Sequence, residues 1–191
     1  MASAPDHRSA STSVPVHPDI AARWSPRVFD TDAELAVEDL TALLEAARWA
    51  ATWGGRQPVR FLVGRRGDSA FSQLKGLLSR GNAYAAAASA LVLVCVDDGE
   101  DDNTARYARV DAGAAMANLS VEAVSRGLVV HPMAGFDVDG ARDLSGGLTP
   151  LAIVAVGRLG HYAQAPDEVA ERDHRPRSRL PLSDVVLNWP L

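Results

Sequence analysis

Arginine-rich segments near the two ends of the chain have the composition of an anion site. Residues 23–27, Arg-Trp-Ser-Pro-Arg, put two guanidinium groups and a hydroxyl within five residues, at an expected helix-to-loop boundary. Such groups can hold a phosphate through charge-assisted hydrogen bonds, each worth about 1.5–3 kcal/mol. Residues 172–184 contain four more arginines, which are Arg172, Arg175, Arg177 and Arg179. Taken alone, a solvated turn and a solvated basic tail are the alternatives for these two segments.

Two connecting loops have sequences that would let a ligand approach the backbone. Residues 46–62, AARWAATWGGRQPVRFL, lead from a helix through a Gly-Gly pair, which leaves room for a planar ligand, and deliver Gln57 into a strand. Residues 127–137, GLVVHPMAGFD, turn from a strand end into a helix, and N–H groups exposed in such a turn can donate to a ligand. Plain connectors are the alternative for both loops. His131 has no second His or Cys at ligand spacing, so we expect it to be structural.

The composition argues against several classes of protein. The 19 basic and 24 acidic residues give a net charge of −5, which disfavours a general nucleic-acid binder. Cys95 is the only cysteine, so an intramolecular disulfide and a multi-cysteine zinc site are excluded and a reducing compartment is favoured. No apolar run reaches the length of about 20 residues that spans a bilayer, and no segment looks like an export signal. We therefore expect a cytoplasmic protein with no nucleic-acid partner, no membrane partner and no metal.

Hydrophobic periodicity predicts the elements that must position these segments. Apolar residues at helical spacing predict a helix over 37–51, an aspartate cap predicts another over 68–79, and small residues mark a long helix over 105–126. The other expected elements are helices at 18–24 and 138–144 and strands at 59–65, 91–96, 128–130 and 151–157. The polar stretch over 160–174 is expected to be irregular. The outcome is an α+β domain of about four strands and five helices.

The length of 191 residues suits one domain. Residues 1–17 lack periodicity and are Pro/Ser-rich, so we expect a disordered N-terminal tail there. Residues 18–191 are expected to form the single domain. Its C-terminal part, from about residue 172, reads as an extended arm because three prolines are spaced through it.

In this order, the segments resemble the FMN-dependent nitroreductase family over roughly residues 20–189. RWSPRVFD resembles the opening segment of that family, LLEAARWA the helix before its flavin loop, and RQPVRFLV the entry from loop to strand. GNAYAAAASALVLVCV is similar to its Asn-bearing helix and central strand, and DAGAAMANLSVEAVSRGL to its core helix. HPMAGFD resembles its flavin-edge turn and RSRLPLSDVV its C-terminal basic arm.

The resemblance implies a nitroreductase-like α+β fold with a central mixed or antiparallel sheet flanked by helices, and an intertwined homodimer with FMN in two clefts between the subunits. It implies that Arg23 and Ser25 contact the FMN phosphate together with Arg177 or Arg179. Arg27 would lie at flavin N1 and O2, and Asn82 at O2 or N3. The whole cofactor-binding set that it implies is Arg23, Trp24, Ser25, Arg27, Gln57, Asn82, Pro132, Met133, Ala134, Gly135, Arg177 and Arg179.

Within this set, Pro132 would pack on the flavin face, and the backbone N–H groups of Ala134 and Gly135 would face N5 and O4. The activity that the resemblance implies is a ping-pong reaction in which NADH or NADPH gives a hydride to flavin N5. A small organic acceptor, such as a nitroaromatic compound or a quinone, then takes the electrons. The chemistry belongs mainly to the cofactor, so no catalytic side chain is required and Arg27 supplies electrostatic support.

The flavin loop departs from the usual family pattern Pro-Ser-Ser-x-Asn-x-Gln-Pro-Trp. Residues 51–59 read ATWGGRQPV, so Thr52 and Trp53 replace the two serines, Gly55 the asparagine and Val59 the tryptophan. Each lost side-chain hydrogen bond would weaken FMN binding by about 1 kcal/mol. Two hypotheses therefore stand: an FMN oxidoreductase that uses NAD(P)H, and a non-catalytic dimer that holds FMN or has weakened flavin binding.

Overall fold

The computed structural model describes residues 8–188 and is built around a four-stranded antiparallel sheet with the strand order β1-β2-β4-β3. The strands are β1 (Val59–Arg65), β2 (Ala90–Val96), β3 (Val129–Met133) and β4 (Thr149–Gly157). The helices are α1 (Pro18–Ala22), α2 (Val37–Arg48), η1 (Trp53–Gly55), α3 (Ser69–Leu77), η2 (Arg80–Ala87), α4 (Asp102–Ser125), α5 (Val138–Leu144), η3 (Tyr162–Gln164), α6 (Asp167–His174) and α7 (Leu182–Val185). The predicted α+β class is confirmed. The sheet, expected to be mixed or antiparallel, is antiparallel.

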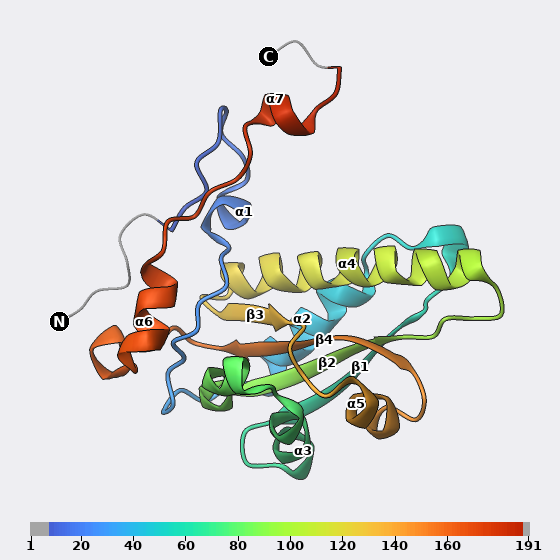
Figure 1. The fold of residues 1–191 in the computed structure, drawn as a ribbon, viewed down its shortest axis with the longest axis horizontal. Coiled ribbons are helices and arrows are strands. Elements are labelled where there is room, and N and C mark those ends of the chain that lie inside the picture. The colour runs from blue at the N-terminus through green and yellow to red at the C-terminus, as the bar shows by residue number, and fades with distance from the viewer. Residues whose placement is uncertain (1–7, 189–191) are drawn as a thin grey trace.

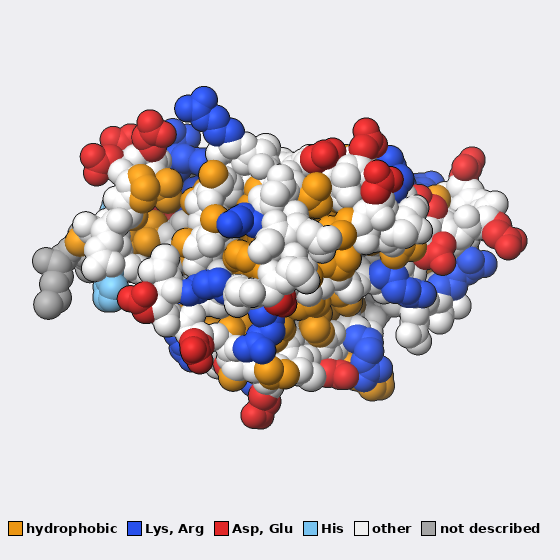
Figure 2. Space-filling model, turned by 90° about the horizontal axis from the view of Figure 1, so that it is seen from below, with side chains coloured by type: hydrophobic (Ala, Val, Ile, Leu, Met, Phe, Trp, Pro, Cys, Tyr) orange, Lys and Arg blue, Asp and Glu red, His pale blue; other side chains and the backbone are white. Residues whose placement is uncertain are grey.

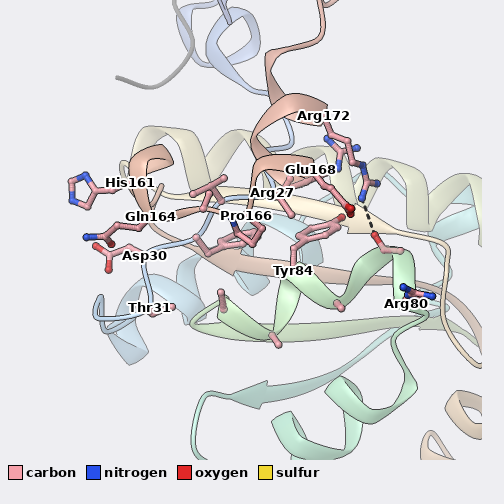
Figure 3. A pocket seen from close by; sticks show the side chains of 18 of the residues that line it. Arg27, Asp30, Thr31, Arg80, Tyr84, His161, Gln164, Pro166, Glu168 and Arg172 are labelled. Carbon is pink, nitrogen blue, oxygen red and sulfur yellow. Dashed lines mark hydrogen bonds between the residues drawn. The ribbon is translucent and has the colours of Figure 1, made fainter. Parts of the chain in front are cut away.

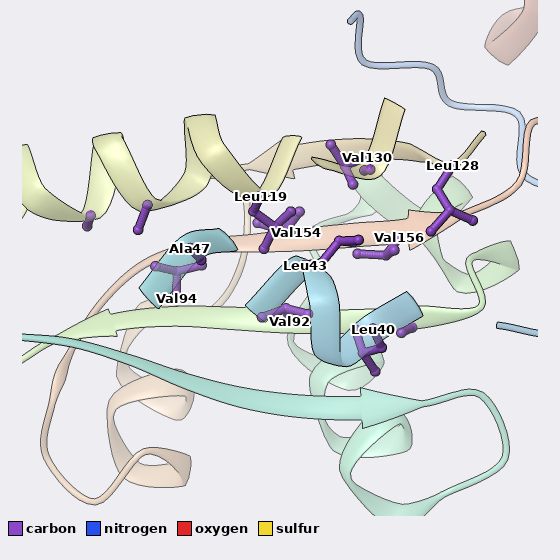
Figure 4. Packing of buried hydrophobic residues seen from close by; sticks show 14 of the residues in the cluster. Leu40, Leu43, Ala47, Val92, Val94, Leu119, Leu128, Val130, Val154 and Val156 are labelled. Carbon is purple, nitrogen blue, oxygen red and sulfur yellow. The ribbon is translucent and has the colours of Figure 1, made fainter. Parts of the chain in front are cut away.

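Strand β2 lies at the centre of the core because both faces of the sheet are covered there. All seven of its residues are buried. Successive side chains of a strand point to opposite faces, so Val92 and Val94 pack toward α2 and α4, while the alternate leucines pack toward α3 and α5. Figure 1 shows α4 along one face and α3 and α5 below the other, and Figure 4 shows Leu43 of α2 and Leu119 of α4 against the strands.

The small residues of α4 allow α2 to lie close against it. Ala108, Ala112 and Ala115 are buried and belong to the same hydrophobic cluster as Leu43 and Ala47 of α2. The distance between packed helices depends on the side chains at their contact, and alanine keeps it short. Helix α4 therefore packs against both α2 and the sheet.

The chain after β4 contains more helix than the sequence predicts. The expectation of an irregular stretch over 160–174 is wrong, because η3 and α6 lie there. Helix α6 is short and mostly polar, so it lacks the apolar stripe that periodicity detects. The arm is extended from Arg175 to Pro181 but then forms the short helix α7. The expected Asn-bearing helix is the 3-10 helix η2.

Residues 8–17 run back along α1. The backbone N–H of Ala10 donates to the carbonyl of Ala21 at 2.8 Å, and these residues lie beside the C-terminal arm in Figure 1. Residues 1–7 of the expected disordered tail and 189–191 of the arm lie outside the described residues. The division of the chain at residue 17 stays a prediction.

The surface of the described part mixes both signs of charge. Figure 2 shows Lys and Arg side chains interspersed with Asp and Glu side chains over the face seen from below. Within residues 8–188, no helix combines the length and the apolar character needed to cross a bilayer.

The close approach of β1 and α3 depends on Gly64, and this generates a stability prediction. A Cβ at Gly64 would lie 2.2 Å from the backbone nitrogen of Phe71 and 2.5 Å from its Cα, whereas a Cβ at Gly76 in α3 meets nothing within 4 Å. We expect Gly64→Ala to lower the free energy of unfolding by about 1–3 kcal/mol or more, since backbone atoms must move apart. The matched control, Gly76→Ala, should raise it by about 0.5–1 kcal/mol. Urea unfolding of both variants measures the difference, and equal effects would contradict the packing.

Candidate functional site

The two ends of the chain meet at a group of four arginines, which we call the basic cluster: Arg8, Arg23, Arg177 and Arg179. Arg177 Nη2 donates to the carbonyl of Arg23 at 3.1 Å, and Arg177 also donates to the carbonyl of Arg8. Figure 1 shows the arm passing α1 at the end of the molecule where α6 lies. The structure therefore brings together arginines that were expected to bind phosphate and that lie more than 150 positions apart in the sequence.

The basic cluster has unbalanced charge. Burial lowers the pKa of Arg23, and the nearby charge of Arg179 lowers it further. Burial also lowers the pKa of Arg177, and the nearby charges of Arg23, Arg179 and Arg8 lower it further. No carboxylate among residues 8–188 forms an ion pair with any of the four guanidinium groups. Like charges that share a partly buried region repel one another, so the cluster is an electrostatic site for an anion.

Residues between Arg23 and Arg27 contribute to this site as well. Arg23 Nη1 lies 3.4 Å from Ser25 Oγ, in position to donate to it. The guanidinium carbon of Arg8 lies 5.1 Å from the ring centroid of Trp24, which is a cation–π arrangement. A hydroxyl and an indole thus border the four cations.

Arg27 is tied to α6 by a buried carboxylate. Its backbone N–H and its Nη1 donate to Asp173 at 2.7 and 2.9 Å, and the Tyr162 hydroxyl donates to the same carboxylate at 2.9 Å. The Asp173 side chain has no exposed surface. Burial, followed by the charge of Asp173, raises the pKa of Tyr162, so this phenol stays a donor. Arg27 Nε is buried and finds no hydrogen-bond partner within the described part of the chain.

The turn after β3 lies against η2 through one carbonyl. Gly135 O accepts three hydrogen bonds. Asn82 Nδ2 donates at 2.8 Å, Ser79 Oγ at 2.8 Å and the backbone N–H of Ser79 at 3.1 Å. A Cβ at Gly135 would lie within 2.8 Å of both side chains, so a larger residue there would displace these two donors. Two expected site residues from distant segments are in direct contact. Of their neighbours in the turn, Met133 is buried and Ala134 is exposed.

A cleft of about 1190 Å³ opens beside this turn, between residues 27–32, η2 and the η3–α6 region. Figure 3 shows the ring of Tyr84 beside Arg27 and Arg172, whose guanidinium carbons lie 5.8 and 5.6 Å from the ring centroid. Burial raises the pKa of Tyr84 to about 12, so its hydroxyl is a donor at neutral pH. Arg27 is the one expected cofactor-binding residue that lines this cleft.

Gln57 and the flavin loop lie elsewhere on the chain. Trp53 stacks on Tyr107 of α4 with 4.8 Å between ring centroids, and its backbone N–H donates to Asp111 at 3.1 Å. Gln57 lines a separate cleft of about 420 Å³ between α2, β1 and α4. In Figure 1, this loop lies at the end of α4 opposite α1. One chain alone does not bring Gln57 to the basic cluster.

Comparison with known proteins decides the family. The model of the nitroreductase family matches residues 20–70 and 69–161, which together are most of the chain. The chain belongs to the nitroreductase family. A Mycolicibacterium smegmatis protein described as an uncharacterized 15.4 kDa protein in the ask 5' region is 59% identical over an alignment of 138 residues, and the match covers 67% of this chain and 94% of that protein.

Solved structures share the fold of this nitroreductase-family chain. A crystal structure of an oxidoreductase containing FMN is 31% identical and has a TM-score of 0.84, with 95% of each chain covered. A Desulfovibrio desulfuricans protein in complex with FMN is 26% identical and has a TM-score of 0.74, with 94% of this chain and 99% of that chain covered. The predicted nitroreductase-like fold is confirmed.

Sequence reasoning missed three residues that build this nitroreductase-family site. Asp173 and Tyr162 lie in the stretch expected to be irregular, and Arg8 lies in the expected tail. No spacing pattern points to a single buried aspartate in a polar segment. An arginine in the middle of an aperiodic tail gives no signal either, although its charge has the same sign as that of Arg23 and Arg177.

His131 joins the Arg23–Arg27 segment to β3, and its pKa gives a pH prediction. Its Nδ1–H donates to Pro26 O at 2.9 Å, and its ring lies 5.2 Å from that of Tyr84. Burial lowers the pKa of His131 in the folded protein below its usual value of about 6.5. As the pH falls through the usual histidine range, the unfolded chain therefore binds more protons at this residue than the folded protein does. The free energy of unfolding that the neutral His131 contributes above that range is then lost.

We expect the free energy of unfolding of the wild type to fall between pH 7.5 and 5.5. In His131→Gln, which keeps an N–H donor but does not titrate, this fall should be smaller. Urea unfolding at the two pH values measures both slopes. A steeper fall in the variant than in the wild type would contradict the burial of a neutral imidazole.

Proposed function

We propose that this protein is a cytoplasmic FMN-dependent oxidoreductase that uses NADH or NADPH to reduce a small organic acceptor. The observation that carries the proposal is the grouping of Arg23, Arg177 and Arg179 in the basic cluster, because guanidinium groups without a carboxylate partner among residues 8–188 fit a phosphate. Membership of the nitroreductase family supports it, as does the likeness to a 31% identical oxidoreductase containing FMN.

The residues present fit FMN by the chemistry of their donors. Arg23, Arg177, Arg179 and the Ser25 hydroxyl would hold the phosphate, whose charge offsets their mutual repulsion. Trp24 lies beside these groups, under the guanidinium of Arg8. The residues proposed to border the isoalloxazine ring are Arg27, Asn82, Pro132, Met133, Ala134 and Gly135. When bound, FMN would supply the redox chemistry that links a nicotinamide donor to an acceptor such as a nitroaromatic compound or a quinone.

The buried Nε of Arg27 is a donor left free for such a ligand. Asp173 accepts from one N–H of Arg27 Nη1 and from its backbone N–H, whereas Nε is buried without a partner in the described part. An unsatisfied buried N–H costs about 1–3 kcal/mol, so a bound acceptor atom would stabilise this arrangement. Asp173 and Tyr162 then hold the guanidinium in place, and the role of Arg27 is electrostatic and involves no proton transfer.

A homodimer would supply what one chain lacks. Gln57 and the flavin loop lie far from the basic cluster of their own chain, so we propose that they reach the flavin bound mainly by the other protomer. The face that carries this loop exposes large apolar side chains: Trp49 is 74% exposed, Val110 61% and Trp53 39%. Exposed apolar surface of this kind is typical of a protein interface.

The second candidate is a dimer that holds FMN without turnover. The observation that favours it is the loop itself, where Trp53 uses its ring to stack on Tyr107 and Gly55 has no side chain to donate. Visible absorption of the purified protein, followed by anaerobic addition of NADH or NADPH, separates the two candidates. Yellow protein that bleaches is the expected result. Yellow protein that stays yellow indicates a holder, and colourless protein that takes up no added FMN overturns both.

Removal of one phosphate-binding guanidinium should weaken FMN binding. Arg23→Ala is expected to raise the Kd for FMN about 10-fold or more, the equivalent of one lost charge-assisted hydrogen bond. Riboflavin, which lacks the phosphate, should bind the variant and the wild type alike. Flavin fluorescence titration measures both ligands. Arg142→Ala removes a surface arginine paired with Asp139 on α5 and is the matched control; the same loss in that variant would contradict the assignment.

A further inference from the structure

We propose that Arg8, from the segment before α1, is a fourth cation of the phosphate site, and that residues 8–17 form a strap that closes over it. This inference rests on the proposed function. It extends the site beyond residues 23–27 and 172–184, the two segments that carry the other arginines. Arg8 lies 15 positions before Arg23 and outside residues 20–161, which match the family model.

The strap is hydrogen-bonded to the C-terminal arm and to α1. Arg8 Nη1 donates to the carbonyl of Arg175 at 2.7 Å, and Arg177 donates in return to the carbonyl of Arg8. Further along, the N–H of Ala10 donates to Ala21 O at 2.8 Å. The arm and α1 therefore both hold the strap, and the side chain of Arg8 lies between them.

The guanidinium of Arg8 is directed to the expected phosphate-binding segment. It lies over the ring of Trp24, the residue between Arg23 and Ser25, with 5.1 Å from its carbon to the ring centroid. Its Nε is buried and has no hydrogen-bond partner among residues 8–188. An anion beside Trp24 would satisfy both the unpaired N–H and the charge.

Arg8 lies among the other cations of the basic cluster. It lies close enough to Arg177 to lower the pKa of that guanidinium, as Arg23 and Arg179 also do. A monoester phosphate carries about −1.5 to −2 charges at pH 7, so it can compensate more than one cation. The phosphate of FMN would therefore offset the repulsion within the basic cluster, whereas riboflavin, which has the same ring system but no phosphate, would not.

The inference is tested by comparing FMN with riboflavin on the full-length apoprotein. Arg8→Met keeps the aliphatic stem over Trp24 and removes the charge, and Arg8→Lys keeps the charge. We expect Arg8→Met to raise the Kd for FMN about tenfold and to leave the Kd for riboflavin within twofold of wild type. Arg8→Lys should restore most of the FMN affinity. Arg142→Met on α5 is the matched control and should change neither Kd.

Salt dependence provides a second readout that a purely structural role would not change. The loss of FMN affinity with rising NaCl should be shallower in Arg8→Met than in the wild type, because one screened cation is gone.

The outcomes distinguish the absence of a phosphate site from the absence of a role for Arg8 in it. Wild-type protein that binds FMN no better than riboflavin overturns the phosphate site, and the proposed function with it. A preference for FMN that Arg8→Met leaves intact overturns the role of Arg8 alone. Equal losses for FMN and riboflavin in Arg8→Met, with an unchanged salt slope, would also overturn it, since they indicate a general loosening of the strap.

Discussion

Repulsion between arginine side chains is the constraint on which the functional end of this molecule depends. The fold brings the guanidinium groups of Arg23, Arg177 and Arg179 together and leaves them without a carboxylate among residues 8–188. Folding free energy from the distant sheet must hold them there, because the core between α2, α4 and β2 is extensive and apolar. The proposed anion site thus depends for its stability on residues that lie far from it.

Two buried polar contacts transmit that stability to residues 23–27. His131 of β3 binds the carbonyl of Pro26, and Asp173 of α6 binds the backbone and side chain of Arg27. Each contact joins the segment to a different element, so the segment is fixed at its last two residues, Pro26 and Arg27. The buried carboxylate is balanced by Arg27, which is the arrangement that makes a buried charge tolerable.

The elements with strong apolar patterns could be predicted from the sequence. The run LVLVCV identified β2, the apolar spacing of Leu40 and Ala47 identified α2, and the aspartate cap identified α3. Helix α6 could not be predicted in this way, since its anchor is the single carboxylate of Asp173 rather than an apolar stripe. The order of the motifs indicated the family and the joining of both chain ends. It could not indicate that Arg27 is paired with Asp173, because that contact spans 146 positions and follows no period.

The edge of the sheet at β3 has a further consequence. β3 is the terminal strand in the order β1-β2-β4-β3, and its fourth residue is Pro132, which has no backbone N–H. A strand from another molecule that tried to extend the sheet at this edge would find a gap in the ladder of donors. Proline here therefore disfavours pairing of two copies through β3 into a continuous sheet.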